Sequence, residues 1–137
     1  MIHLIKLAVG VRDVAHLAAL QTAMAARNPP LRHTTRNTPK RAAELCDGGS
    51  IYWVIGGAVL VRQRILNILP ETESDGSPCA ALVLDPALVR VEARAMRAFQ
   101  GWRYLKPEDA PADLNTSQDT ANMPEAMRRE LAALGLL

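Results

Sequence analysis

The hydrophobic and polar positions at the start of the chain change from the period of a strand to the period of a helix. Residues 3–9 alternate, which predicts a strand that ends at Gly10. Apolar side chains then recur at helical spacing after Asp13, a favourable N-cap residue, until Asn28-Pro29-Pro30 stops the run. The first unit of the fold is therefore predicted to be a strand followed by a helix.

The clearest local pattern is a pair of apolar runs, residues 51–55 and 58–66, on either side of Gly56-Gly57. Two glycines tolerate the positive φ angles of a tight hairpin turn, so this pattern predicts a β-hairpin. A turn of two residues places Trp53 opposite Leu60.

Alternation along that hairpin places Trp53, Arg62 and Arg64 on one face. Arg62 then lies diagonal to Trp53, within reach of a cation–π contact. Two interpretations follow for the arginines: an internal stack or salt bridge, or the binding of a ligand anion against Trp53.

The remaining residues form shorter runs. Thr38-Pro39 supplies a cap and a first-turn proline for a short helix that Gly48-Gly49 ends. Residues 71–78 have the composition of a flexible loop, and the runs that flank Asp85-Pro86, residues 79–84 and 88–91, predict two more strands.

Towards the end of the chain, residues 106–122 read as a polar linker and residues 124–134 as an amphipathic helix. With 137 residues and 49% hydrophobic side chains, the chain has the size of one domain with a real core. We therefore expect a single α+β domain over residues 1–137, with a small, mostly antiparallel sheet or partly open barrel and flanking helices.

The composition of the chain bears on which locations and which kinds of site are expected. No run of apolar residues is long enough for a membrane span, and the first residues lack a secretory pattern, so we expect a cytoplasmic protein without membrane contacts. Cys46 and Cys79 are solitary, and the three histidines are scattered. No spacing indicates a metal site, a cofactor or a catalytic pair, so none is expected.

Charge is unevenly distributed. Residues 27–64 carry seven basic and two acidic side chains, a net charge of +5. Residues 70–137 carry seven basic and eleven acidic side chains, a net charge of −4. The basic middle indicates a surface that faces a polyanion, and a normally mixed surface is the alternative.

Two segments are dense in groups that recognise ligands. The composition of segment 32–38 predicts an exposed polar connection. Its His33, Thr35 and Arg36 are suited to binding a phosphate or carboxylate group, and a simply solvated loop is the alternative. The segment 99–105 is suited to stacking and hydrogen bonding with a base, or to anchoring the sheet edge. Its candidate residues are Gln100, Trp102, Arg103 and Tyr104.

Taken together, residues 33–41, 48–55, 62–65 and 99–105 resemble a bacterial family of short proteins known as domain of unknown function 1489. The resemblance covers nearly the whole chain and implies no activity. Residues 38–66 also resemble the PUA-like folds, including the ASCH and EVE domains, where a short helix leads into a hairpin of a pseudo-barrel that often binds RNA or modified bases. The ASCH pattern G-x-K-x-x-E-x-R is not met, because Lys40 and Glu44 are four residues apart.

Three functions remain open at this point. The first is a PUA-like module that presents Arg36, Trp53, Arg62 and Arg103 to RNA, with phosphate contacts and base stacking. The second is a hydrolase for a nucleotide-like substrate, with His33 as acid or base and Arg36 and Arg62 as an anion clamp. The third is a structural protein whose aromatic residues form an interface.

Overall fold

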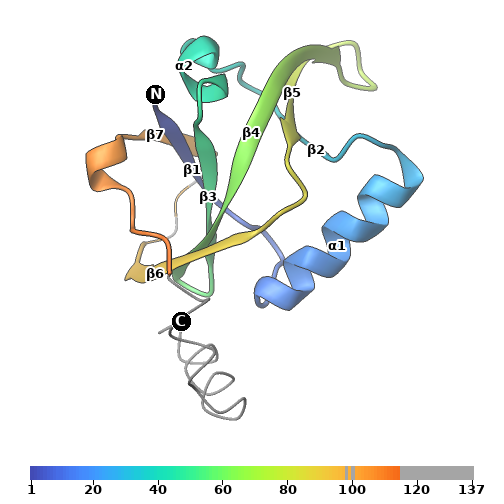
Figure 1. The fold of residues 1–137 in the computed structure, drawn as a ribbon. Helices are drawn as coiled ribbons and strands as arrows, with labels where there is room; N and C mark the ends of the chain where they lie inside the picture. Colours follow the sequence, from blue (N-terminus) through green and yellow to red (C-terminus); the bar gives the residue numbers. More distant parts are fainter. Residues whose placement is uncertain (98, 100, 115–137) are drawn as a thin grey trace.

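A computed structural model describes residues 1–97, 99 and 101–114 (Figure 1). Its elements are β1 (His3–Leu7), α1 (Val14–Arg27), β2 (Arg32–Thr35), α2 (Ala42–Cys46), β3 (Ser50–Ile55), β4 (Ala58–Thr72), β5 (Pro78–Leu84), β6 (Val89–Ala95), β7 (Trp102–Leu105) and the 3₁₀ turn Pro107–Asp109. The mixture of a mostly antiparallel sheet with few helices confirms the α+β class.

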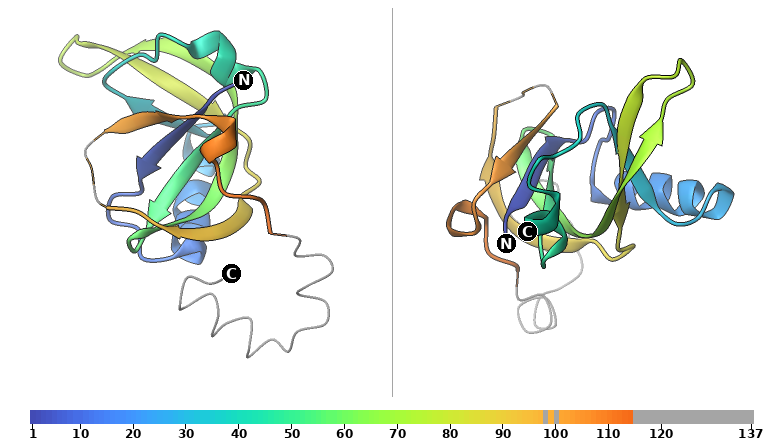
Figure 2. Two further views of the ribbon diagram at one scale, coloured as in Figure 1. Left: turned by 90° about the vertical axis from the view of Figure 1, so that its left-hand side faces the viewer. Right: turned by 90° about the horizontal axis from the view of Figure 1, so that it is seen from above.

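The seven strands form one sheet in the order β2-β5-β4-β3-β1-β7, and β6 pairs with β4 off this path. Only the β1–β3 pair is parallel among the described strands. The long strand β4 organises the rest, because its first half pairs with β3 and β6 and its second half with β5. Figure 2 shows the β4–β5 hairpin projecting from the body of the sheet.

The predicted hairpin and first helix are confirmed. Gly56 and Gly57 turn the chain with φ angles of 61° and 84°. The carboxylate of Asp13 caps α1 by accepting a hydrogen bond from the backbone N–H of His16, at 2.7 Å. The strands predicted around Asp85-Pro86 are also present as β5 and β6.

The predicted register of the hairpin is wrong beyond its first pair. Val54 faces Val59 but Trp53 faces Val61, so Leu60 is an extra residue that forms a β-bulge. Past a bulge, the side chains of one strand exchange faces relative to a regular hairpin. Arg62 therefore pairs with Tyr52 and lies on the face of the sheet opposite Trp53.

The predicted polar connection at residues 32–38 is also wrong in part. Residues 32–35 form β2, which pairs antiparallel with β5. The short helix α2 begins at Ala42 rather than after Thr38, and β4 extends to Thr72, into the expected loop. The predicted helix 124–134 and residues 115–122 of the predicted linker lie outside the described residues.

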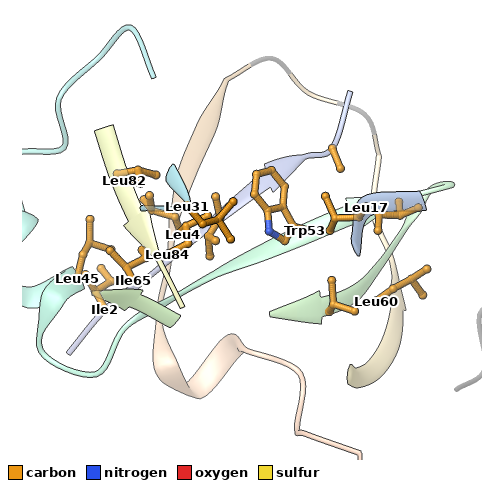
Figure 3. Packing of buried hydrophobic residues seen from close by; sticks show 14 residues of the cluster. Ile2, Leu4, Leu17, Leu31, Leu45, Trp53, Leu60, Ile65, Leu82 and Leu84 are labelled. Atoms are coloured by element: carbon orange, nitrogen blue, oxygen red, sulfur yellow. The ribbon is translucent and has the colours of Figure 1, made fainter. Parts of the chain in front are cut away.

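Both faces of the central strands are buried. One face carries Leu4, Ile51 and Trp53, and we call it the pocket-side face because a pocket lies on it. Its core includes Leu17 of α1 and Leu82 of β5 (Figure 3). On the opposite face, a smaller core is built from Ile5, Tyr52, Val54, Val59 and Val91. In the described part of the chain, no helix is long and apolar enough to cross a membrane.

Candidate functional site

A pocket of about 200 Å³ lies between α1 and the pocket-side face of the sheet. Its apolar walls include Leu17, Leu20, Met24, Leu31, Trp53 and Leu84, and its polar groups are Lys6, Gln21, Arg32 and His33. Leu20 and Met24 are exposed at 43% and 41%, although both are large apolar side chains. The pocket is therefore a mostly apolar cavity with an apolar rim and a few polar groups, the usual character of small-ligand sites.

The imidazole of His33 meets the indole of Trp53 edge to face in this pocket, with ring centroids 5.2 Å apart. Nε2 of His33 is buried and has no hydrogen-bond partner in the described part of the chain. Burial, and to a lesser extent the positive charge of Lys6, lower the pKa of His33 to about 4. His33 is thus a neutral ring at physiological pH whose Nε2 is buried beside the pocket without a hydrogen-bond partner in the described residues.

Trp53 is held in place by an amide. Its Nε1 donates to Oε1 of Gln63 at 3.2 Å. The same Gln63 exchanges two hydrogen bonds with Gln21 of α1, at 2.8 and 2.7 Å, and donates to the carbonyl oxygen of Asp85 at 2.8 Å. This network fixes the indole and binds α1 to the sheet.

Lys6 and Gln21 are the polar residues of the pocket that sequence reasoning missed. Lys6 is the charged one of the two. It pairs with Trp53 on β3 and with Trp102 on β7, so the three side chains lie in one row on the pocket-side face. The lysine is half-buried, and burial lowers the pKa of its ammonium group. Its position in the alternating run of residues 3–9, in phase with Leu4 and Ala8, was a signal that it points inward.

The predicted aromatic segment lies at the β7 edge. Nε1 of Trp102 donates to the carbonyl oxygen of Asn37 at 3.3 Å, and the backbone N–H of Arg41 donates to Oη of Tyr104 at 3.1 Å. These contacts fasten the segment before α2 to the sheet. Arg103 points to the opposite face, where its guanidinium lies 4.6 Å from the ring centroid of Phe99.

The other candidates of these two segments are dispersed. The hydroxyl of Thr35 is buried and donates to the carbonyl oxygen of Asn37 at 3.0 Å. Arg36 is exposed in the turn that follows β2. Gln100 lies outside the described residues.

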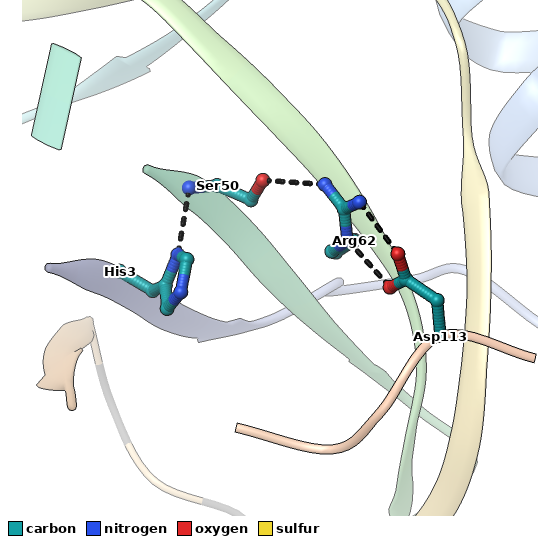
Figure 4. Close-up of polar contacts among 4 residues, drawn as sticks. All are labelled: His3, Ser50, Arg62 and Asp113. Atoms are coloured by element: carbon teal, nitrogen blue, oxygen red, sulfur yellow. Dashed lines mark hydrogen bonds and ion pairs between the residues drawn. The ribbon is translucent and has the colours of Figure 1, made fainter. Parts of the chain in front are cut away.

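Arg62 takes part in an internal network on the opposite face (Figure 4). Its Nε and Nη2 donate to the two carboxylate oxygens of Asp113, each at 2.7 Å, and its Nη1 donates to the hydroxyl of Ser50 at 3.0 Å. The backbone N–H of Ser50 donates to Nδ1 of His3 at 3.0 Å. The guanidinium of Arg62 holds the pKa of Asp113 below its ordinary value.

This arrangement corrects two expectations about Arg62. The cation–π contact with Trp53 is absent because the two side chains lie on opposite faces. Arg62 is likewise not placed to clamp an anion together with Arg36 at His33, because His33 lines the pocket while the guanidinium of Arg62 lies on the opposite face and is occupied by Asp113. Arg64 follows Arg62 on the same face and is exposed.

No group of three or more His, Cys, Asp or Glu side chains in residues 1–97, 99 and 101–114 is placed to hold a metal ion. Cys46 and Cys79 are free thiols, and burial raises the pKa of both. The groups that the pocket offers are the cations Lys6 and Arg32, the amide of Gln21, the neutral imidazole of His33 and an apolar wall.

Comparison with known proteins gives one match. A family model described as Protein of unknown function (DUF1489) matches residues 4–137. No curated protein and no solved structure matches the chain.

We predict that Gln63→Leu lowers the free energy of unfolding by about 3 kcal/mol or more, because it leaves buried groups of Trp53, Gln21 and Asp85 without partners. Urea denaturation measures this change. Thr72→Leu, at an exposed position of the same strand, is the control and changes stability by about 0.5 kcal/mol or less. Equal stability of Gln63→Leu and the wild type would contradict the network.

We predict the opposite sign for His33→Phe, which keeps a ring in place and removes an unsatisfied nitrogen. Its stability at pH 7 should match or exceed that of the wild type by about 1 kcal/mol. His3→Phe is the matched control and is destabilising, because it leaves the buried N–H of Ser50 without its acceptor.

The pH dependence of stability gives a second readout of His33. Because burial lowers the pKa of folded His33 from 6.5 to about 4, the unfolded chain binds more protons between these values. The wild type therefore loses stability as the pH falls through this window, and His33→Phe loses less. Thermal unfolding at several pH values tests this, and parallel curves for the two proteins would refute it.

Proposed function

The chain belongs to the family Protein of unknown function (DUF1489), and from the geometry of the pocket we propose that it binds single-stranded RNA by taking in one unstacked base. RNA-binding proteins commonly read unpaired bases by packing them against aromatic rings and by hydrogen bonding their edges. The pocket at α1 offers both kinds of contact.

The size of the pocket supports a ligand with a single ring system. Its volume of about 200 Å³ lies below the roughly 300 to 1,000 Å³ that is usual for sites that enclose drug-sized molecules. The walls are apolar, and Trp53 and His33 contribute aromatic surface to them. A base that enters this space exchanges water for apolar and aromatic contacts.

The observation that carries the proposal is the unsatisfied Nε2 of His33. A buried polar atom without a partner costs about 1 to 3 kcal/mol, and native proteins rarely keep one without a reason. A base edge supplies both donors and acceptors, so a base that displaces the atoms now covering this nitrogen satisfies it in either neutral tautomer of the imidazole.

Charge around the pocket also supports a nucleic acid. Lys6 and Arg32 line it, and the exposed Arg36 follows directly after β2. Phosphate contacts from such side chains position a strand without reading its sequence.

The geometry favours this module over the two other hypotheses. In the described part of the chain, Nε2 of His33 has no hydrogen-bond partner, so His33 does not form the oriented nucleophile–base pair that many hydrolases use. Trp102 and Tyr104 are half-buried and hydrogen-bonded to the segment before α2, so their contacts serve the fold rather than an exposed interface.

The test is fluorescence anisotropy with a labelled, single-stranded RNA of about ten nucleotides at low salt. We predict that the wild type binds and that His33→Phe weakens binding by about tenfold, the loss of one hydrogen bond of roughly 1.4 kcal/mol. His16→Phe, on α1 and outside the pocket lining, is the matched control and binds as the wild type does.

A double-stranded RNA of the same sequence separates base insertion from simple attraction to phosphates. It presents about twice the backbone charge with its bases stacked, so simple attraction to phosphates favours the duplex, whereas insertion of an unstacked base favours the single strand. We expect the duplex to bind more weakly. The absence of RNA binding by the folded wild type, or equal binding of His33→Phe, would rule out the proposal.

A further inference from the structure

The side chain of Lys6 is in an unusual position for a lysine. Its neighbours across the sheet are two tryptophans, Trp53 on β3 and Trp102 on β7. All three lie on the face that α1 covers, and Lys6 itself lines the pocket. The aliphatic part of the side chain therefore packs in an apolar row, and the ammonium group borders the cavity.

No carboxylate of the described residues forms an ion pair with Lys6. Two half-buried arginines of the same sheet show the contrast. Nη1 of Arg32 lies 3.2 Å from Oε1 of Glu71, and Nε of Arg62 lies 2.7 Å from Oδ1 of Asp113. A half-buried charge is costly without a counter-ion, and an anionic ligand bound at Lys6 would supply one.

The ammonium group is also close to the proposed base site. The positive charge of Lys6 is one of the two causes that lower the pKa of His33. An anion at Lys6 would thus border a ring held against His33 and Trp53. One molecule that carries both a ring and a negative charge satisfies the two groups together.

We infer that Lys6 binds a phosphate of the same nucleotide whose base enters the pocket. This inference rests on the proposed function and adds to it that recognition requires base and phosphate together. The phosphate can belong to a free nucleotide or to an RNA strand, because both present oxygens that accept hydrogen bonds from an ammonium group. Arg32 is less suited to this role because Glu71 already neutralises it.

The experiment is isothermal titration calorimetry with the four common ribonucleosides and with their 3′- and 5′-monophosphates. In the wild type, the monophosphate of the preferred base should bind at least about tenfold more tightly than its nucleoside. Lys6→Met keeps the length of the side chain and removes its charge, so it should bind nucleoside and monophosphate alike. Lys40→Met, at an exposed site, is the matched control and keeps the difference.

A labelled RNA of about ten nucleotides identifies the source of the phosphate. A strand that binds more tightly than the monophosphate, with a salt dependence that Lys6→Met reduces by about one counterion, supports a phosphodiester. A monophosphate that binds more tightly than the strand supports a free nucleotide. Either result agrees with the inference.

Equal affinity of nucleoside and monophosphate in the wild type would overturn it, as would a difference that persists in Lys6→Met. The proposed base site survives in both cases, whereas absent binding of nucleosides, nucleotides and RNA refutes the proposed function itself. If Lys6→Met does not fold, Lys6→Gln replaces it, and equal affinity of nucleoside and monophosphate in the wild type refutes the inference without any variant.

Discussion

The pocket side of the sheet depends on the hydrogen bonds of one buried amide, that of Gln63. This side chain is fully buried, and its oxygen and nitrogen reach the indole of Trp53, the amide of Gln21 and the backbone of Asp85. A buried amide is stable only when its donors and acceptors have partners. Gln63 therefore fixes the position of α1 through Gln21, the orientation of the Trp53 indole, and the backbone at Asp85 between β5 and β6.

The two faces of the sheet differ in how completely their polar groups are satisfied. On the opposite face, His3, Ser50, Arg62 and Asp113 form a continuous network in which the guanidinium and the carboxylate are paired. On the pocket-side face, the amide network is complete, but Nε2 of His33 has no partner and Lys6 no counter-ion in the described part of the chain. This asymmetry is why we propose that recognition takes place in the pocket, whereas the paired groups around Arg62 stabilise the fold.

The sequence predicted the elements whose structure depends on residues close together in the chain. It missed features that depend on contacts between residues far apart in the chain. The two glycines at 56–57 determine the hairpin turn, but the bulge at Leu60 has no local signature and moves Trp53 away from Arg62. β2 has a polar composition typical of loops, and only its pairing with β5 makes it a strand. Lys6 is in phase with Leu4 and Ala8, so the alternation of the strand indicates that its side chain points inward. Its two tryptophan neighbours follow only from the order of strands in the sheet.

The most direct test of the central claim, that a ring ligand enters the pocket beside Trp53 and His33, is a ¹⁵N NMR titration with single-stranded RNA. The chain has two tryptophans, so its spectrum shows two indole N–H signals. The imidazole of His33 and the indole of Trp53 should shift together at saturating RNA, and the imidazole of His3 on the opposite face should stay in place. Shifts confined to Trp102 and the β7 edge, with His33 unchanged, would contradict the account.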